Sequence, residues 1–463
     1  MSALWTSDEI VAATGGTLHG DPFEVVGVTF DSREVETGHL FVAMPGSVAD
    51  GHDFVQRAYG MGAVAALVSR RVDRTHILVD DVAEALTRLA IAARARITGK
   101  VIGVTGSVGK TSTKEALAVA LERGAPGRVH RSVKSYNNHT GVPLSLARMP
   151  RTSEYAVLEM GMNHAGEIAA LTRLVRPHVA VVTALASAHI EHLGSMEAIA
   201  DAKAEIFEGL EPEGVAIIPD DSEWRDRLVR GARRFADRTI GFGGPDADVA
   251  ALHAVRSEAG GSLVTARLVD SELTFTIAQR GDHWVSNALA VLAAVEAAGA
   301  DVALAGLALA DMGGLKGRGE RHRLPVGEGH FLLIDESYNA NPASMAATLQ
   351  SLGEERDVTR RIAVLGPMRE LGAEADAMHA ALAPAVIAAK VDQLVLVGGD
   401  MRPLEDALDG DVIVDRAEAA DDAAQILARI VEPGDVVLVK ASNSIGLARL
   451  VERMAGGLAT CST

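Results

Sequence analysis

Short, uninterrupted runs of apolar residues recur along this chain, and segments with apolar residues at helical spacing separate them. The runs that predict buried strands are YAVLEMG (155–161), VAVVTAL (179–185), GVAIIPD (214–220), FLLIDES (331–337), RIAVLGP (361–367), QLVLVGG (393–399) and DVVLVKAS (435–442). Strands that are apolar throughout and alternate with helices are typical of parallel sheets covered by helices on both faces. The pattern therefore predicts an α/β protein.

Two changes in this pattern divide the chain into three parts. Near residue 82 the strand-like HILVDD gives way to a long helical segment, and residues 313–325 (GGLKGRGERHRLP) are rich in glycine and arginine, as expected of a hinge. The length of 463 residues also suits about three domains of ~150 residues each. We therefore expect a smaller N-terminal α/β domain (1–81), a central domain with a parallel or mixed sheet like that of P-loop ATPases (82–323) and a C-terminal Rossmann-like domain (324–463).

The segment VIGVTGSVGKTS (101–112) has the pattern of a buried strand that runs into a phosphate-binding loop. Gly106 and Gly109 allow the backbone to curl so that successive N–H groups face an anion. Lys110 supplies a charge for the β- and γ-phosphates, and Thr111 offers a hydroxyl to Mg²⁺. A helix is expected next, because TSTKEALAVALERG has apolar residues at helical spacing and ends in glycine.

The loop departs from the strict G-x-x-x-x-G-K-[ST] pattern, because Val104 stands where the first glycine belongs and the sequence reads T-G-x-x-G-K-T. The alternative is a glycine-rich turn between a strand and a helix, with a surface lysine. The order of strand, glycines, Lys-Thr and helix favours a nucleoside triphosphate site. The residues assigned to the nucleotide here are Gly106, Ser107, Gly109, Lys110, Thr111 and Ser112.

Composition narrows the function and the location. The net charge of −18, from 44 basic and 62 acidic residues, argues against general nucleic-acid binding, which needs a basic face. The single cysteine, Cys461, excludes disulfides within the chain and suits a reducing compartment. The first residues lack the pattern of a secretory leader, and Thr6 and Glu9 instead have the spacing of a helix capping box. No apolar run reaches the ~20 residues that cross a bilayer, so we expect a cytoplasmic protein without membrane insertion.

Candidate metal ligands follow two of the predicted strands. Glu159 lies near the carboxyl end of one strand, where open α/β sheets bind ligands, and a carboxylate there can hold Mg²⁺. The alternative is an edge-strand glutamate in water. His189 lies with Glu191 and His192 in the loop predicted after another strand, although a lone histidine is more often a surface or hydrogen-bonded residue. Lys203 lies in the amphipathic segment SMEAIADAKAEIFEGL, and its spacing alone places it in solvent.

Further polar candidates lie at a strand end, at a helix start and in the hinge. Asp335 ends a strand, where carboxylates suit ribose or metal contacts, and Tyr338 and Asn339 follow in a polar loop. Asn287 lies near the first turn of the helical segment DHWVSNALAVLAAVEAAG, where it can cap the helix or contact a base. Arg318 can swing toward a phosphate when domains close, and its alternative is a solvated linker arginine.

Together these segments resemble the Mur ligase family over almost the whole chain, and within it the members that join D-alanyl-D-alanine to UDP-N-acetylmuramoyl-tripeptide. The resemblance is carried by DSREVETGHLFVAMPG, DGHDF, TGSVGKTSTKE, YNNHTGVPLSL, LEMGMNHAGEI, AHIEHLGSMEAIADAKAEIFEGL, DESYNANPASM and GPMRELGAEADAMH. The last three distinguish these members best, since the sibling that adds the third residue typically carries D-Y-A-H-x-P where DESYNANP stands here.

The resemblance implies a ligase that uses ATP and Mg²⁺ and passes through an acyl phosphate, with the three domains binding the uridine nucleotide, ATP and the dipeptide in turn. The residues that it makes catalytic are Lys110, His189, Lys203 and Arg318. Its metal ligands are Thr111, Glu159, His189 and, if carbamylated, Lys203. Its further nucleotide contacts are Asn287, Arg318 and Asp335. Its substrate contacts are Asp31, Ser32, Arg33, Asn137, Asn138, Tyr338 and Asn339, although Asp31 to Arg33 would also suit an ordinary turn. We expect a monomer that binds these two substrates and no nucleic acid.

Two positions depart from the family pattern, and two other classes compete with it. Trp284 stands where a second asparagine often precedes Asn287 by three residues, so an aromatic ring can stack in place of an amide contact. KASN (440–443) replaces a common K-G-S-R, so no role is assigned to that arginine.

Folylpolyglutamate synthetase shares the ligase architecture, but DSREVETGHLFVAMPG and DESYNANP do not suit it. A switch GTPase would carry N-K-x-D, and no lysine here follows an asparagine. A transport ATPase would release ADP without co-substrates.

Overall fold

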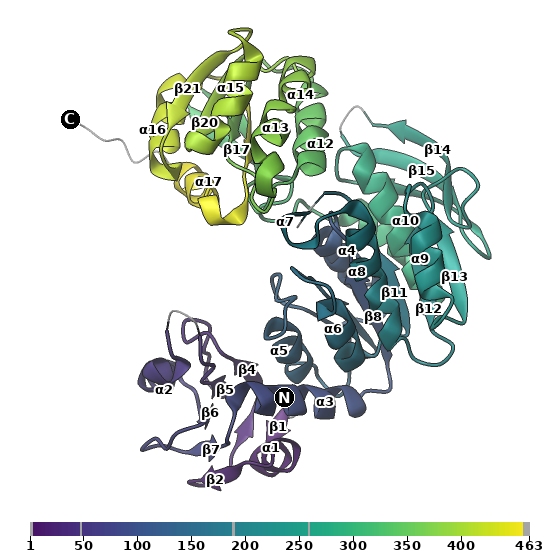
Figure 1. Ribbon diagram of the computed structural model, residues 1–463, viewed down its shortest axis with the longest axis vertical. Coiled ribbons are helices and arrows are strands. Elements are labelled where there is room, and N and C mark those ends of the chain that lie inside the picture. Colours follow the sequence, from purple (N-terminus) through teal and green to yellow (C-terminus); the bar gives the residue numbers. More distant parts are fainter. Residues whose placement is uncertain (1–2, 47–48, 188–189, 258–259, 457–463) are drawn as a thin grey trace.

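The computed structural model describes residues 3–46, 49–187, 190–257 and 260–456, which form three α/β parts arranged along an arc (Figure 1). The N-terminal part (purple) lies at the bottom, the central part (blue to teal) at the right and the C-terminal part (green to yellow) at the top. The first and last parts therefore face each other across an open side. Within the described ranges, none of the helices combines the length and the apolar character needed to cross a membrane.

The N-terminal part is built on a small, mostly parallel sheet. Its elements are β1 (Trp5–Thr6), α1 (Ser7–Thr14), β2 (Thr17–His19), β3 (Glu24–Val25), β4 (Gly27–Thr29), β5 (His39–Val42), α2 (Val55–Met61), β6 (Ala65–Val68) and β7 (His76–Leu78). The sheet order is β2-β7-β6-β5-β4, and β1 pairs with β3 separately. The predicted capping box is confirmed: the Glu9 N–H donates to Thr6 Oγ1, and the Thr6 N–H donates to the Glu9 carboxylate.

The central part holds a six-stranded parallel sheet in the order β13-β12-β11-β8-β10-β9, with a three-stranded antiparallel sheet, β14-β15-β16, beside it. Its first elements are α3 (Val82–Ala95), β8 (Lys100–Thr105), α4 (Lys110–Glu122), β9 (Val129–Arg131), α5 (Gly141–Ala147), β10 (Tyr155–Glu159), α6 (Glu167–Val175), β11 (Val179–Val182), α7 (Ile190–Leu193) and α8 (Met196–Ala204). The later ones are β12 (Val215–Pro219), α9 (Arg225–Ala232), β13 (Arg238–Phe242), β14 (Ala250–Arg256), β15 (Ser262–Arg267), β16 (Glu272–Ile277), α10 (Asp282–Ala297) and α11 (Val302–Asp311). The predicted central strands are present because each is buried on both faces of this sheet.

Helix α3 connects the first two parts. Asp81 caps its first turn, so the division we expected after residue 81 falls at the start of this helix. Leu86 and Leu89 are buried in one apolar cluster that also contains Ile10 of α1 and Leu144 of α5. The helix therefore packs against both the N-terminal and the central part.

The C-terminal part holds a six-stranded sheet in the order β17-β18-β22-β19-β20-β21, parallel except for β17. Its elements are β17 (Glu320–Val326), β18 (Gly329–Glu336), α12 (Pro342–Gly353), β19 (Arg361–Leu365), α13 (Ala375–Ala380), α14 (Ala383–Ala388), β20 (Gln393–Val397), α15 (Arg402–Leu408), β21 (Ile413–Ala417), α16 (Ala420–Ile430), β22 (Val436–Lys440) and α17 (Ala448–Ala455). The predicted α/β class, with parallel strands between helices, is confirmed.

The predicted hinge over 313–325 is wrong in its second half, because Glu320 begins β17, which pairs with β18 along its whole length. The polar sequence ERHRLPV lacks the apolar pattern of a buried strand. Charges and a proline are nevertheless typical of an edge strand, one side of which stays unpaired. The boundary expected after residue 323 lies inside this strand. We therefore propose to divide the central and C-terminal parts before Glu320.

Candidate functional site

The predicted phosphate loop connects β8 to α4 and has the backbone that its glycines permit. Gly106 has a φ of 151° and Gly109 a φ of 86°. A side chain at Gly106 would meet the hydroxyl of Thr183, since its Cβ would lie 1.9 Å from that oxygen. Helix α4 begins without a side-chain cap, so its first N–H groups remain available to an anion.

Lys110 lies across this loop rather than in solvent. Its Nζ donates to the carbonyl oxygen of Gly106 at 2.7 Å and is 3.4 Å from that of Ser107. Burial lowers the pKa of the Lys110 ammonium, and the carboxylate of Glu159 opposes this shift. The Ser107 N–H is directed away from a ligand, because it donates to the carbonyl of Ala184 at 2.8 Å.

Three further candidates meet around the carboxylate of Glu159, which is 1% exposed at the end of β10. Thr111 Oγ1 donates to its Oε2 at 2.8 Å, and Asn137 Nδ2 donates to its Oε1 at 2.8 Å. Arg318 Nη2 donates to Thr111 Oγ1 at 3.0 Å, from the segment that leads into β17. The structure thus brings Thr111, Glu159, Asn137 and Arg318 together, while Asn138 binds the Thr140 and Gly141 N–H groups of its own turn.

Lys203 differs from the solvated lysine that its helical position predicts. Its side chain is fully buried, and within the described part of the chain its Nζ has no hydrogen-bond partner. Burial, followed by the charge of Lys110, lowers the pKa of this amine well below its ordinary value. A buried, unpaired amine is costly, so this position calls for a chemical explanation.

A cavity of about 300 Å³ lies beside the loop, between α10 of the central part and the C-terminal part. Besides loop residues, it is lined by His283, Trp284, Asn287, Arg318, Glu336, Asn339, Asn341, Thr348 and Lys440. Asn287 lies close to the loop, since a Cβ on Gly109 would stand 2.9 Å from its Oδ1. Trp284 is buried at the same wall, with 5% of its surface exposed.

The strand end at DESYNANP places its two carboxylates differently. Asp335 is 1% exposed and accepts from the N–H groups of Gly317 and Ser337, so it holds the segment next to Arg318. Glu336 lines the cavity and lies 3.5 Å from Lys440 Nζ. Sequence reasoning named Asp335 and missed Glu336 and Lys440. Adjacent residues of a strand face opposite sides, and only the tertiary structure decides which side meets the cavity.

The remaining predicted residues of this strand end have distinct surroundings. The Arg318 guanidinium lies 4.2 Å from the ring centre of Tyr338, and burial raises the pKa of that phenol. Lys440 Nζ donates to the Asn339 carbonyl at 3.0 Å, and burial lowers the pKa of this lysine. Both Tyr338 and Asn339 therefore lie near cations of the site.

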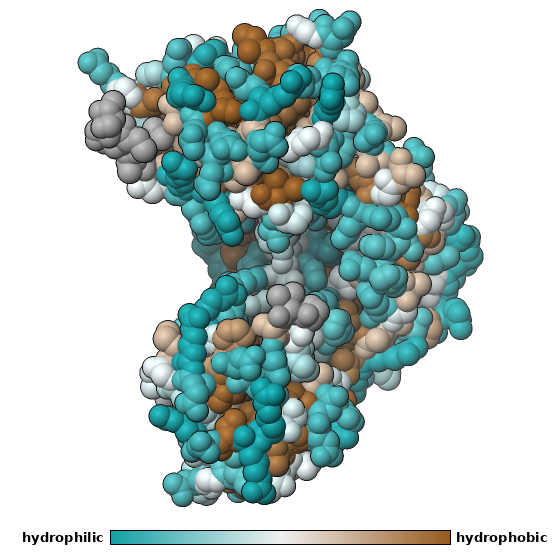
Figure 2. All heavy atoms as spheres, turned by 60° about the vertical axis from the view of Figure 1, so that its left-hand side comes forward, coloured by the Kyte–Doolittle hydropathy of each residue, from teal (hydrophilic) through white to brown (hydrophobic). Residues whose placement is uncertain are grey.

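Asp31, Ser32 and Arg33 follow β4 and line a separate cavity of about 440 Å³ with Phe30, Phe54 and Arg57. The Arg33 guanidinium donates to Asp31 and lowers the pKa of that carboxyl to about 2. Glu34 next to them pairs with Lys134 and accepts from Tyr136 at 3.2 Å, so this turn adjoins the segment that carries Asn137. Figure 2 shows a hollow between an upper and a lower lobe of the molecule.

The predicted histidine ligand, His189, lies outside the described residues, so its role stays a prediction. Glu191 and His192 were expected in a loop, but they belong to the short helix α7. The Glu191 N–H lies 3.4 Å from the Glu370 carbonyl, so α7 contacts the GPMRELGAEADAMH segment of the C-terminal part. That contact depends on tertiary packing, which the local sequence does not reveal.

A phosphate loop at the edge of a parallel sheet, with an arginine and a lysine contributed from beyond that sheet, defines a P-loop nucleotide-binding enzyme. Comparisons with known protein families identify the family within this class. Residues 24–94 match the catalytic domain of the Mur ligase family, residues 104–295 the Mur ligase middle domain, and residues 317–443 the Mur ligase, glutamate ligase domain. The chain belongs to the Mur ligase family.

Individual relatives agree with this assignment. The chain is 34% identical to the UDP-N-acetylmuramoyl-tripeptide–D-alanyl-D-alanine ligase of Bacillus subtilis, over 96% of this chain and 97% of that protein. It is 36% identical to the ligase of that name from Escherichia coli, over 85% and 86%. A MurF structure from Acinetobacter baumannii matches with a TM-score of 0.83 at 29% identity, over 98% and 99% of the two chains. The MurF ligase of Thermotoga maritima in complex with ADP matches with a TM-score of 0.76 at 28% identity, over 93% and 97%.

Proposed function

We propose that this chain uses ATP to join D-alanyl-D-alanine to UDP-N-acetylmuramoyl-tripeptide in the synthesis of peptidoglycan precursors. The observation that carries the proposal is the contact between Arg318 and Thr111, which brings an arginine from the segment before β17 to the phosphate loop. The family assignment and the relatives of this name support the reaction. Their full-length coverage argues that the whole chain takes part.

The chemistry requires that two anions meet. The tripeptide carboxylate attacks the γ-phosphorus of ATP, a C–O–P linkage forms, the bond from the γ-phosphorus to the β–γ bridging oxygen breaks and ADP leaves. Lys110 and Arg318 would offset the negative charge during this step. The free amine of the dipeptide then attacks the acyl phosphate, and loss of phosphate and a proton leaves the amide.

The residues around Glu159 fit Mg²⁺, because a hydroxyl and a buried carboxylate supply oxygen donors 2.8 Å apart. Thr111 and Glu159 would hold this ion, and His189 stays a predicted ligand. Bound Mg²⁺ would supply positive charge to the phosphate oxygens. A carbamate on Lys203 would add a buried carboxylate nearby and would account for its unpartnered amine.

We further propose that the three parts divide the substrates. Asp31 to Arg33 and the cavity beside them suit the uridine nucleotide, and the 300 Å³ cavity suits ATP. The C-terminal part would hold the dipeptide, with Tyr338 and Asn339 near the reacting groups. Closure of the parts would exclude water from the acyl phosphate.

An ADP-release assay tests the proposal. The wild-type chain should release ADP only when ATP, the UDP-linked tripeptide and D-alanyl-D-alanine are all present, and single amino acids should not replace the dipeptide. Lys110→Ala should lower this rate at least about 100-fold, because it removes a charge aimed at the transferred phosphate. Lys100→Ala changes an exposed lysine at the start of β8, the strand that precedes the loop, and serves as the control. Near-native turnover of Lys110→Ala, or ADP release without the two co-substrates, would contradict the assignment.

A further inference from the structure

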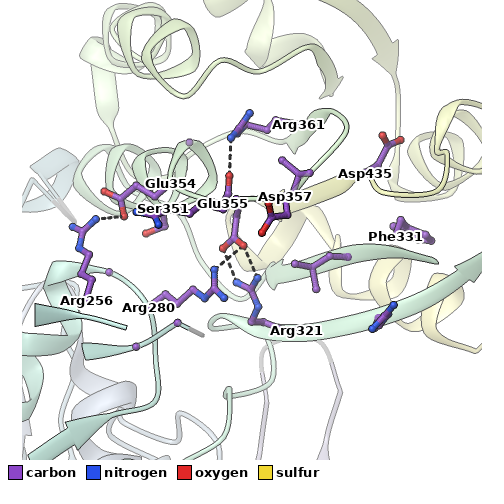
Figure 3. Close-up of a pocket in the computed structure, with 18 of the residues that line it drawn as sticks. Arg256, Arg280, Arg321, Phe331, Ser351, Glu354, Glu355, Asp357, Arg361 and Asp435 are labelled. Carbon is purple, nitrogen blue, oxygen red and sulfur yellow. Dashed lines mark hydrogen bonds and ion pairs between the residues drawn. The ribbon is translucent and has the colours of Figure 1, made fainter. Parts of the chain in front are cut away.

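A buried carboxylate joins the central and C-terminal parts at some distance from the phosphate loop. Glu355 follows α12 and points its carboxylate toward Arg280 and Arg321 (Figure 3). It is 5% exposed. Its Oε2 accepts from Arg280 Nη1 at 2.9 Å, and its two oxygens accept from Arg321 Nη1 and Nη2 at 2.9 and 2.8 Å. Arg361 Nη2 donates to its main-chain carbonyl at 2.7 Å, which fixes the backbone of the same residue.

The residues that converge on Glu355 come from elements that also form the nucleotide cavity. Arg280 lies just before α10, whose first turns carry Trp284 and Asn287. Arg321 lies in β17, three residues after Arg318. Glu355 itself follows α12, which lines the cavity with Ala343, Ser344, Ala347 and Thr348. One carboxylate thus connects α10, the Arg318 segment and α12.

The geometry of this ion pair fixes the relative orientation of the two side chains in addition to pairing their charges. Arg321 presents two parallel N–H groups to the carboxylate, an arrangement that fixes direction as well as distance. Because Glu355 is almost excluded from water, its loss would leave two guanidinium groups without their shared anion. The neighbouring pair of Arg256 and Glu354 also crosses between the two parts, but its side chains are 50% and 35% exposed, so solvent screens it.

We propose that Glu355 is a positioning residue of the ATP site: it holds α10, the Arg318 segment and α12 in the register that the bound nucleotide requires. The inference rests on the proposed function, in which the 300 Å³ cavity takes ATP. Glu355 does not line that cavity, so its influence passes through Arg280 and Arg321. Because the same contacts set the approach of Arg318 to Thr111, the residue affects nucleotide binding before it affects the other two substrates.

Calorimetric titration with ADP tests this role without the other substrates. Glu355→Gln keeps the shape but removes the charge, and we expect it to weaken ADP binding and raise the KM for ATP at least about tenfold. The KM values for the tripeptide and the dipeptide should change by less than about twofold. Glu354→Gln removes the adjacent, exposed interdomain carboxylate and should leave ADP affinity at the wild-type value.

Arg321 provides a second set of variants in case Glu355→Gln does not fold. Arg321→Met should weaken ADP binding, and Arg321→Lys should restore part of the affinity because it keeps the cation but not the paired N–H groups. A purely structural role would lower the melting temperature and the active fraction without changing ADP affinity or the KM for ATP, and that result would overturn the proposal. A wild-type chain that binds ADP normally but makes no peptide bond would contradict the proposed function instead.

Discussion

Lys203 has surroundings that differ sharply from those its local sequence predicts. The helical segment around it is amphipathic, which places a lysine in solvent, yet the side chain is fully buried and its amine lacks a partner in the described structure. Burial lowers the pKa of this amine well below its ordinary value, which favours the neutral form. A neutral amine can attack CO₂, and the product is a carbamate and one proton.

We expect this carbamate to be detectable directly. With ¹³C-labelled bicarbonate, the wild-type protein should show a carbamate carbon signal that is missing from Lys203→Met. The variant should also lose activity by about 100-fold, because it cannot form the carbamate that would add a negative group to the proposed Mg²⁺ site. Identical spectra for the two proteins, together with full activity of Lys203→Met, would rule out the modification.

His130 provides a pH-dependent test of burial. Burial lowers the pKa of its imidazole to about 4 in the folded state, from an ordinary value of 6.5, and its Nε2 lies 2.7 Å from the Ser145 carbonyl oxygen. At a pH between these two pKa values, the unfolded chain binds more protons at His130 than the folded chain does. This residue therefore makes the folded state less stable as the pH falls. His130→Gln should therefore reduce the loss of unfolding free energy between pH 7 and pH 5.

Urea denaturation at the two pH values measures this difference. His253→Gln changes an exposed histidine of β14 and should leave the pH dependence unaltered. An unchanged dependence in His130→Gln would mean that His130 titrates alike in the folded and unfolded states.

At the scale of elements, Lys114 of α4 fixes the segment that carries Asn137. Its fully buried ammonium donates to the carbonyl oxygens of Ser132 at 2.9 Å and Lys134 at 2.6 Å, and it pairs with Glu115 at 2.8 Å. Helix α4 therefore positions both the phosphate loop at its start and the segment that reaches Glu159 from the side. A lysine one turn after the loop motif would ordinarily be expected in solvent, so the sequence alone does not indicate this structural role.

Removing this ammonium should be costly. Lys114→Met removes the ammonium donor from the Ser132 and Lys134 carbonyl groups and leaves Glu115 with Arg131 as its remaining cation, so we expect the free energy of unfolding to fall by about 2–4 kcal/mol. Lys100→Met, an exposed lysine of β8, should change it by less than about 0.5 kcal/mol. Chemical denaturation measures both, and equal stability of the two variants would contradict this role of Lys114.

An element can be predicted from the sequence when the residues that determine it are close together in the chain. The buried strands β10, β11 and β18 could be predicted because parallel strands between helices are apolar throughout. The edge strand β17 was missed because its arginines and proline look like a hinge. The phosphate loop could be predicted because strand, glycines and lysine are adjacent in the sequence. The burial of Lys203 and the position of Glu336 depend on packing between distant segments, so the sequence alone did not reveal them.

In the molecule as a whole, segments far apart in the chain must act together on one reaction. Arg318 contacts Thr111 from beyond the central sheet, and Glu355 joins the C-terminal part to Arg280 of the central part. The turn at Asp31 adjoins the segment that carries Asn137, through Glu34 and Lys134. These three contacts lie near proposed substrate sites, which is the arrangement expected of an enzyme that closes around its substrates.

Isotope transfer from the tripeptide carboxylate to phosphate shows whether this site activates a peptide carboxylate with ATP. The wild-type chain is incubated with ATP, D-alanyl-D-alanine and UDP-N-acetylmuramoyl-tripeptide that carries ¹⁸O in both oxygens of its terminal carboxylate, and the products are weighed by mass spectrometry. Activation through an acyl phosphate predicts an amide product that retains one ¹⁸O and a released phosphate that gains the other. Unlabelled phosphate, or ADP formed without the amide product, would contradict the claim that this site activates a peptide carboxylate with ATP.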